Sequence, residues 1–411
     1  MNGSSPVISK YTSNQQVEKS DLMTKITLFV TLLFIFFVPF GDGVWPGLPR
    51  ISAILAIGFS LILFLMHGTR RNYNLFHFLS ILYIAWQLIS LMWTPDLERG
   101  MVVATTSVQL ILLVFLLTLV IDNRKKVLWA YQAYVLGNIS GSGIIISNYI
   151  QGIQSPYYNR YGIQNLETDM LSVFLALSIP MAAYLATTRS NKIFKLINLI
   201  AIPLVFYAIF LTGTRTGSIV GGIGILYWLF THRKAPILVK ASIAVMIIVS
   251  VITILNFAPK YSTDRIFSAG KSITTGTLNY RSVIWEGSLS QWEKSPIIGT
   301  GLGGLGFVLS KEYINFNGAH NAFIHNLTEN GIIGLFLYLS VILSILYYIL
   351  QAPMDEKAFM ITLLLVLIMS QLTLHTHTEK ITWIVFSLLS VHASRFTITK
   401  KDKPTILKLS P

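Results

Sequence analysis

Long apolar stretches, separated by short polar connections, follow one another along the sequence from residue 26 onward. A helix that crosses a bilayer needs roughly 17–25 mostly apolar residues. Twelve stretches have this length or come close to it: 26–40, 51–66, 75–93, 101–121, 127–149, 170–186, 193–211, 216–231, 237–257, 332–350, 359–374 and 381–394. This pattern predicts an all-α integral membrane protein with about twelve transmembrane helices.

One connection, residues 258–331, is far longer than the others and is rich in glycine and aromatic residues. Within it, Trp285, Leu289 and Trp292 recur at helical spacing, which predicts an amphipathic helix over 280–294 that rests on the outer leaflet. The predicted organisation is a cytoplasmic leader over 1–25, nine transmembrane helices over 26–257, one large periplasmic loop over 258–331, three transmembrane helices over 332–394, and a basic cytoplasmic tail over 395–411.

The composition agrees with a membrane protein. Only 12% of the residues are charged, against about 25% in an ordinary soluble domain, and 53% are apolar, which excludes a soluble enzyme. The chain has no cysteine, so disulfides and thiolate chemistry are excluded. The predicted spans carry no ionisable residue near their middle, whereas ion-coupled transporters keep such residues at depth. This difference argues against transport.

The net charge of +14 in a soluble protein would suggest a nucleic-acid partner. In a membrane protein, the side on which Lys and Arg lie sets the topology. With the N-terminus inside, 20 of the 31 Lys and Arg residues and 6 of the 17 acidic residues lie on the inner side. We therefore expect both termini in the cytoplasm, no nucleic-acid partner, and a neutral outer face. The first apolar stretch lacks a small-x-small cleavage site and is interpreted as a retained helix.

The first polar candidate on the outer face is Arg215, in the turn Thr212–Gly217 between two predicted spans. A guanidinium at the start of a helix can hold an anion, because it gives bidentate hydrogen bonds and the helix adds free N–H groups. An arginine that extends to lipid headgroups is the alternative interpretation.

The second candidate is Arg281, at the start of the predicted amphipathic helix and next to Tyr280. A cation is poorly placed at a helix N-terminus, which favours a functional role. The glycines that follow include the spacing Gly301-x-Gly303-x-x-Gly306, but no strand precedes them, so we expect tight turns rather than a dinucleotide site.

Histidines supply two further candidates. His320 precedes Asn321 at a predicted membrane mouth, where an imidazole can act as a base near neutral pH. His325 lies five residues on, so the two histidines share a helix face poorly and a metal pair is not expected. In the last outer loop, His375 and His377 alternate with threonines ahead of Glu379; they could hold a metal if extended, but the sequence offers no further ligand.

Taken together, these stretches resemble the O-antigen ligase/polymerase superfamily. The resemblance rests on Arg281 ahead of Trp285, on the run Ser-Pro-Ile-Ile-Gly-Thr-Gly-Leu-Gly over 295–303, and on Arg215 in its Thr-Arg-Thr-Gly turn. It also rests on His320-Asn321, nine residues, and then Gly-x-x-Gly over 331–334, the ligase pattern of that family.

The resemblance implies a GT-C-like fold and a metal-independent, inverting glycosyltransferase without a cofactor. Its donor is a glycan on undecaprenyl diphosphate at the periplasmic face of the bacterial inner membrane, and a ligase passes that glycan to a sugar hydroxyl of the lipid A core. Arg215 and Arg281 are expected to hold the diphosphate, and His320 to act on the acceptor hydroxyl. Arg160, Tyr280 and Asn321 are the further substrate-binding candidates.

Two other functions stay open at this point. A repeat-unit polymerase uses the same donor and transfers to a second lipid-linked glycan, so motifs that bind diphosphate do not separate it from a ligase. A transporter of small anions or lipid-linked sugars is the third possibility, against which the uncharged span interiors argue.

Overall fold

The computed structural model describes residues 6–67, 73–155, 160–231, 252, 256, 259–267, 281–312 and 318–401, and all regular structure within these ranges is helical. The elements are α1 (Pro6–Phe37), α2 (Gly41–Val44), α3 (Leu48–His67), α4 (Leu75–Ile89), η1 (Ser90–Trp93), α5 (Leu97–Val120), α6 (Arg124–Ile150), α7 (Thr168–Thr188), α8 (Lys192–Leu211), α9 (Arg215–Thr231), α11 (Lys260–Phe267), α13 (Arg281–Lys294), α14 (Gly304–Glu312), α15 (Ala322–Leu350), α16 (Met354–Gln371), η3 (Thr376–Thr378) and α17 (Lys380–Lys401).

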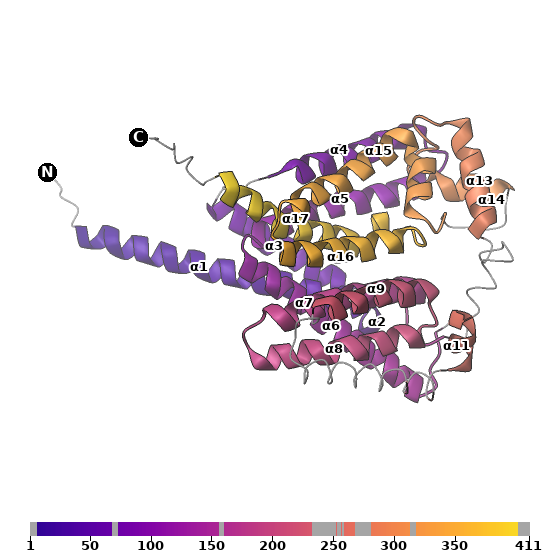
Figure 1. The fold of residues 1–411 in the computed structure, drawn as a ribbon. Coiled ribbons are helices and arrows are strands. Elements are labelled where there is room, and N and C mark those ends of the chain that lie inside the picture. Colours follow the sequence, from indigo (N-terminus) through magenta and orange to yellow (C-terminus); the bar gives the residue numbers. More distant parts are fainter. Residues whose placement is uncertain are drawn as a thin grey trace, which may run out of the picture.

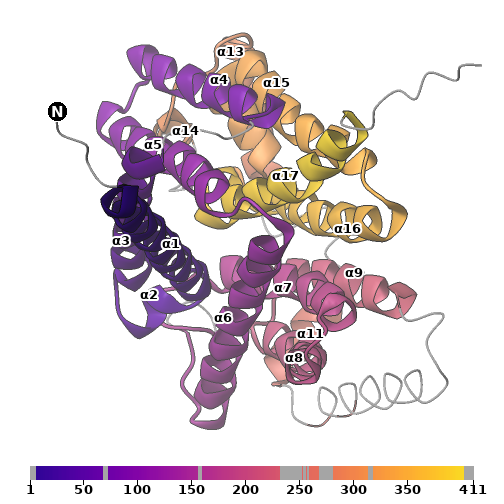
Figure 2. The same ribbon diagram turned by 90° about the vertical axis from the view of Figure 1, so that its left-hand side faces the viewer.

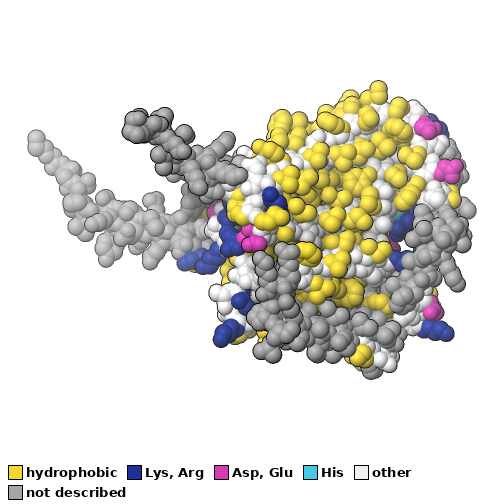
Figure 3. Space-filling model, viewed as in Figure 1, with side chains coloured by type: hydrophobic (Ala, Val, Ile, Leu, Met, Phe, Trp, Pro, Cys, Tyr) yellow, Lys and Arg dark blue, Asp and Glu magenta, His cyan; other side chains and the backbone are white. Residues whose placement is uncertain are grey.

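The long helices run side by side, and α1 begins and α17 ends at the same end of the bundle (Figure 1). We call this the inner end, following the predicted topology, and the opposite end, where α11, α13 and α14 gather, the outer end. A broad apolar band covers the side of the bundle between charged side chains at the two ends (Figure 3). Such a band suits contact with lipid.

Within the ranges that the structure describes, six helices are long and apolar enough to cross a membrane: Leu48–Met66, Leu75–Trp93, Leu97–Val120, Thr168–Thr188, Lys192–Leu211 and Ala322–Leu350. The remaining predicted spans also coincide with helices, with one exception. The predicted span 237–257 lies outside the described residues apart from 252 and 256. The prediction of a helical, multi-pass membrane protein is therefore confirmed, while the number of twelve spans and the GT-C-like arrangement stay predictions.

Short polar side chains fix where several helices begin. Asn74, Asp96, Asn123, Asn191 and Asn321 each precede a helix, and each accepts a hydrogen bond from a backbone N–H of its first turn. Capping of this kind satisfies N–H groups that have no partner within the helix. The caps therefore set the level at which α4, α5, α6, α8 and α15 start.

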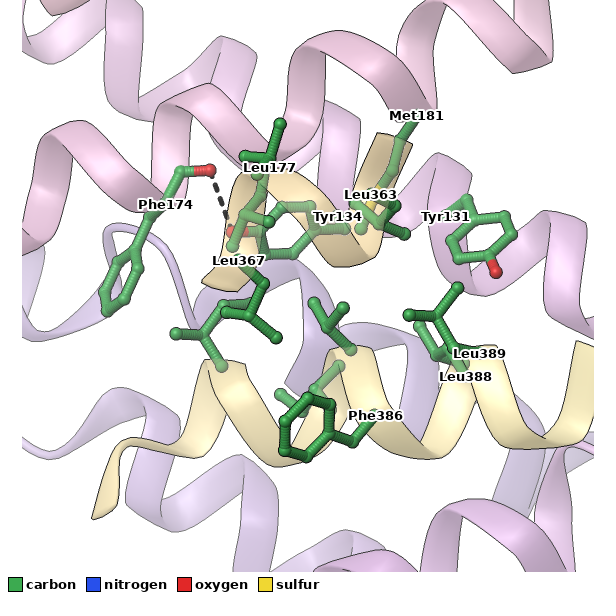
Figure 4. Packing of buried hydrophobic residues seen from close by; sticks show 14 of the residues in the cluster. Tyr131, Tyr134, Phe174, Leu177, Met181, Leu363, Leu367, Phe386, Leu388 and Leu389 are labelled. Atoms are coloured by element: carbon green, nitrogen blue, oxygen red, sulfur yellow. Dashed lines mark hydrogen bonds between the residues drawn. The ribbon is translucent and has the colours of Figure 1, made fainter. Parts of the chain in front are cut away.

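Helix α7 lies at the centre of the bundle, among α6, α8, α9 and α16 (Figure 2). It is the most enclosed of the six candidate spans, with 89% of its apolar window buried. Leu177 of α7, Leu363 of α16 and Phe386 of α17 belong to one buried hydrophobic cluster, and the Tyr134 hydroxyl donates a 2.8 Å hydrogen bond to the Phe174 carbonyl (Figure 4). This core fixes the surrounding helices relative to α7.

A polar network joins four helices at the inner end. The Glu356 carboxylate of α16 lies 2.7 Å from the Arg124 guanidinium of α6 and 3.2 Å from Nε2 of His392 on α17. It also accepts a short hydrogen bond from the Tyr184 hydroxyl of α7, and Tyr131 contacts Nδ1 of His392 at 3.2 Å. Each carboxylate oxygen thus has a partner, which makes this network a structural link between the helices.

Candidate functional site at the outer end

His320 lies in the tight turn before α15, at the outer end. Its φ of 46° is uncommon for a residue other than glycine, so the surroundings must hold the turn. One support is Trp285 of α13, whose indole N–H donates a 2.8 Å hydrogen bond to the Ala319 carbonyl. Burial and the positive charge of Arg281 lower the pKa of His320, and the negative charge of Asp169 partly opposes them. A neutral imidazole able to accept a proton is the result.

Asn321 fixes the same turn from its other side. Its side-chain oxygen accepts hydrogen bonds from the backbone N–H groups of Phe323 and Ile324, at 2.9 and 3.1 Å, and its amide donates to the Leu372 carbonyl at 3.1 Å. The side chain is therefore occupied in capping α15 and in tying it to the loop after α16. These contacts fix the turn that carries His320, and the substrate-binding role expected for Asn321 stays a prediction.

Two of the predicted arginines lie near His320. The buried Arg160 forms a 2.9 Å ion pair with Asp169 at the start of α7 and a 3.1 Å hydrogen bond with Thr168. The pKa of Glu167 is raised, mainly by burial, while the charges of both Arg160 and Arg281 act to lower it. Carboxylates at the start of α7 therefore lie within electrostatic range of both arginines and of His320.

Arg215 begins α9 beside the same start of α7. The backbone N–H of Tyr161 donates to the Leu211 carbonyl at 3.3 Å, which joins the Arg160 loop to the end of α8. Two residues after Arg215, a Cβ on Gly217 would press on Ser172 of α7. The close approach that this glycine permits brings the start of α9 against α7, and the anion-holding role of Arg215 stays a prediction.

The glycine-rich run interlocks with a break in α15. Gly331 interrupts the helix with a φ of 66°, and a Cβ there would collide with the Ile297 carbonyl. A Cβ on Gly299, whose φ is 73°, would collide with the Glu329 carbonyl in turn. The backbone N–H of Gly301 donates to that carbonyl at 2.9 Å. The glycines thus serve tight turns and close backbone contact, which confirms the prediction from their spacing.

The structure adds three histidines that sequence reasoning did not join to His320. The His375 ring lies 5.6 Å from the His320 ring and stacks on His325 at 5.3 Å, with the two planes 13° apart. His377 lies 5.0 Å from His325, and Nε2 of His325 lies 3.3 Å from the Glu329 carboxylate. The alternation of His375 and His377 is visible in the sequence. Their neighbours His320 and His325 come from around the start of α15, so the sequence spacing does not reveal the contact. Within the described ranges, no three His, Asp or Glu residues have an arrangement that could hold a metal ion.

A cavity of about 370 Å³ lies beside this cluster, between α1, α3 and α5. Phe34 and Leu110 contribute to its apolar wall, whereas Arg50, Glu379 and Lys380 supply its charged groups. Burial raises the pKa of Glu379. Tyr280, the remaining predicted site residue, lies outside the described residues.

A helical bundle with an apolar band, and with arginines and histidines gathered at its outer end, defines a multi-pass membrane protein with polar chemistry at one end of its helices. Residues 199–339 match the family model described as O-antigen ligase. This match confirms the family resemblance predicted from the sequence and supports a glycosyltransferase-like enzyme with an O-antigen ligase or polymerase type of function. The matched segment includes Arg215, Arg281 and His320. A comparison with curated proteins gave no match.

Proposed function

We propose that this protein is an O-antigen ligase of the bacterial inner membrane. It transfers a glycan from undecaprenyl diphosphate to a sugar hydroxyl of the lipid A core, at the periplasmic face, with both chain termini in the cytoplasm. The distribution of Lys and Arg between the two sides supports this orientation, because the whole net charge of +14 falls on the inner side.

The donor diphosphate leaves with its electron pair and needs fixed positive charge. We assign this role to Arg215 and Arg281, whose planar guanidinium groups match phosphate oxygens, and Arg160 supports them beside Asp169. No nucleotide sugar is expected outside the cytoplasm, so the energy of transfer comes from the lipid diphosphate itself. With arginines in this role, the reaction proceeds without a metal ion.

The acceptor hydroxyl attacks the anomeric carbon from the face opposite the diphosphate, which inverts the configuration. His320 accepts the hydroxyl proton as the new C–O bond forms and the bond to the diphosphate breaks. Its lowered pKa suits this role, because a neutral imidazole is the form that can accept a proton. Asn321 acts as a positioning residue for His320, and Tyr280 as a substrate contact.

One observation carries the proposal. His320 and Arg281, some forty residues apart in the sequence, lie within electrostatic range of each other at the outer end, inside the segment that matches the O-antigen ligase family. A cation beside a neutral base is the pair that glycan transfer from a lipid diphosphate requires.

Deletion of the gene, followed by analysis of lipopolysaccharide and of lipid-linked glycan, tests the function. We expect a core without attached glycan, together with accumulation of lipid-linked polymer. A core that carries a single repeat unit would instead identify a polymerase, and an unchanged profile would contradict both functions.

Complementation with variants then tests the site. The wild-type gene and Arg124→Ala, an inner-end variant with a matched loss of charge, should restore the profile. Arg281→Ala should not restore it, although the protein is inserted in the membrane at normal abundance. Full restoration by Arg281→Ala would contradict the assignment of that residue.

A further inference from the structure

Four histidine rings and one glutamate lie close together in a row that begins at His320. Ring centroids are 5.6 Å apart between His320 and His375, and 5.3 Å apart between His375 and His325. His325 in turn contacts the Glu329 carboxylate at 3.3 Å. His377 flanks the row at 5.0 Å from His325. The row leads from the half-buried His320 to a carboxylate that is only 3% exposed.

The ring nitrogens along this row are unusual for buried polar atoms. Nδ1 of His320, His325 and His375, and both ring nitrogens of His377, are enclosed and have no hydrogen-bond partner in the described part of the chain. His325 is 9% and His377 2% exposed. Buried polar groups are nearly always hydrogen-bonded, so a set of such nitrogens in one place calls for an explanation.

Gly318 keeps two of these nitrogens close together. A Cβ on this glycine would lie 3.2 Å from Nδ1 of His375 and 3.3 Å from Nδ1 of His325. The two stacked rings therefore direct the same nitrogen to the same side, against backbone that has no side chain. Two ring nitrogens that lie on the same side in this way can exchange a proton through one bridging water molecule.

The far end of the row is anchored. One oxygen of Glu329 faces His325, and the same oxygen accepts a hydrogen bond from the backbone N–H of Leu305 at 3.2 Å. Leu305 is in the first turn of α14, directly after the glycine-rich run. The carboxylate is thus held where it stabilises a positive charge on His325.

We propose that His375 and the His325–Glu329 pair form a proton-accepting row that takes over, from His320, the proton released by the acceptor hydroxyl. This inference rests on the proposed function. The hydroxyl O–H bond breaks as the C–O bond to the glycan forms, and the electron pair of the broken glycosyl bond leaves with the diphosphate. The proton passes from His320 to His375 and then to His325, beside the Glu329 carboxylate, and returns to water by the same row. His320 is neutral again for the next acceptor.

Other charged groups face the row and set its proton affinity. Arg281 on α13 and Asp169 on α7 act on His320 with opposite signs. Arg99 on α5 acts on His375, whose pKa is lowered to about 3, chiefly by burial. His375 therefore passes the proton on rather than keeping it, because it holds a proton weakly, and the ring that receives it lies 3.3 Å from the Glu329 carboxylate.

Replacement of His375 tests the row in vesicles that contain the purified protein, the lipid-linked donor and the acceptor. His375→Ala opens space for a small base, whereas His375→Gln fills that space without a titratable group. We expect both variants to lower kcat at least about tenfold, less than the roughly 10²–10⁴-fold loss that removal of a general base causes. The KM for the donor should not change. Added imidazole should restore His375→Ala and not His375→Gln.

Two results would overturn the row. One is a kcat of the wild-type size in His375→Ala; the other is a loss, equal at every pH, that imidazole does not reverse in a protein with a normal thermal unfolding transition. His392→Gln at the inner end is the matched control for the loss of a buried histidine, and its activity should not respond to imidazole.

A second measurement does not depend on transfer. Diethyl pyrocarbonate modifies neutral imidazole, so the pH at which His320 becomes reactive, read by mass spectrometry, reports its protonation. A proton on His325 repels a proton on His320, so His325→Gln, which cannot take up a proton, should move this pH upward. If it does not move, the coupling is absent and the row is wrong, whether or not the wild type transfers glycan. If the wild type fails to transfer but the shift occurs, the proposed function fails and the coupling stands.

Discussion

The chain pairs a histidine with a glutamate at each end of the bundle. At the inner end His392 contacts Glu356 at 3.2 Å, and at the outer end His325 contacts Glu329 at 3.3 Å. The inner carboxylate also binds Arg124 and a tyrosine hydroxyl, so both of its oxygens have partners within four packed helices, and Nε2 of His392 is the one ring nitrogen there without a hydrogen bond among the described residues. The outer pair instead continues into stacked imidazoles with buried nitrogens that have no partner among the described residues.

The contrast shows that a buried histidine–glutamate pair can serve either structure or chemistry, and that its surroundings decide which. Where both oxygens of a buried carboxylate are held by several side chains of packed helices, as in Glu356, the group fixes structure. At the outer end, several imidazole nitrogens beside the pair have no hydrogen-bond partner among the described residues, and Arg281 lies close to His320. These imidazoles are therefore available to take part in a proton transfer. Four predictions examine this contrast, from the largest expected effect to the smallest.

Replacing a histidine should have opposite consequences at the two ends. His320→Ala should lower glycan transfer by roughly 10²–10⁴-fold, because it removes the proposed base, and should leave the thermal unfolding transition near that of the wild type. His392→Ala should keep transfer per folded molecule and lower stability by about 1–3 kcal/mol, because buried partners lose a contact. Assays on detergent-purified protein measure both quantities. Equal activity loss in the two variants would remove the distinction between the ends.

Replacing an arginine gives the second comparison. Arg281→Ala should reduce transfer by about 10²–10³-fold, the loss expected when one fixed stabiliser of a leaving anion is removed. Arg124 is 47% exposed at its side chain, so Arg124→Ala should cost at most about 1 kcal/mol of stability and no activity. Initial rates on a lipid-linked donor, and unfolding curves, measure the two effects.

The pH dependence of kcat/KM should follow the charges around His320. Its pKa is lowered, so the acid limb should fall below about pH 6.5, the ordinary value for histidine. Asp169 opposes that lowering, and Asp169→Asn should therefore move the limb to still lower pH, by less than about one pH unit. Asp355→Asn, at the start of α16, is a control that should leave it in place. An upward shift in Asp169→Asn would contradict the sign of this effect.

The last prediction concerns stability in acid rather than activity. His375 has a pKa of about 3 when folded, chiefly because of burial, against 6.5 when unfolded. The unfolded chain then binds a proton more tightly, so stability is complete above about pH 6.5 and declines as the pH falls toward 3. His375→Gln should flatten the dependence of the unfolding temperature on pH in this interval. An identical slope in wild type and variant would mean that His375 is not the group responsible.

Periodicity was sufficient for much of the fold. Apolar stretches of membrane length predicted where the helices lie, and the spacing of Trp285, Leu289 and Trp292 predicted α13, which begins at Arg281. It did not predict which side of α13 is buried: Ile284, Ser288 and Gln291 face inward, and the tryptophans are half-buried beside them. Packing partners decide such a face, and they come from distant parts of the chain.

The site was predictable only one segment at a time. Arg281 could be found because a cation is unfavourable at the start of a helix, and His320 because an imidazole at a membrane mouth can act as a base. Their proximity to Asp169 and His375 depends on how α7, α15 and the loop before α17 pack, which no local spacing encodes. The histidine row is therefore a tertiary feature, joined across more than fifty residues of sequence.

The break at Gly331 has a consequence for how the protein is made. Residues 296–297 accept hydrogen bonds from the N–H groups of Ile332 and Ile333, at 3.0 and 3.4 Å, where α15 cannot supply its own acceptors. Backbone groups without partners near a bilayer each cost several kcal/mol. Completion of α15 during biogenesis therefore has to wait for the preceding loop to dock. Any insertion that keeps Ile297 from Gly331 should yield a chain that membrane quality control degrades, rather than an inserted but inactive enzyme.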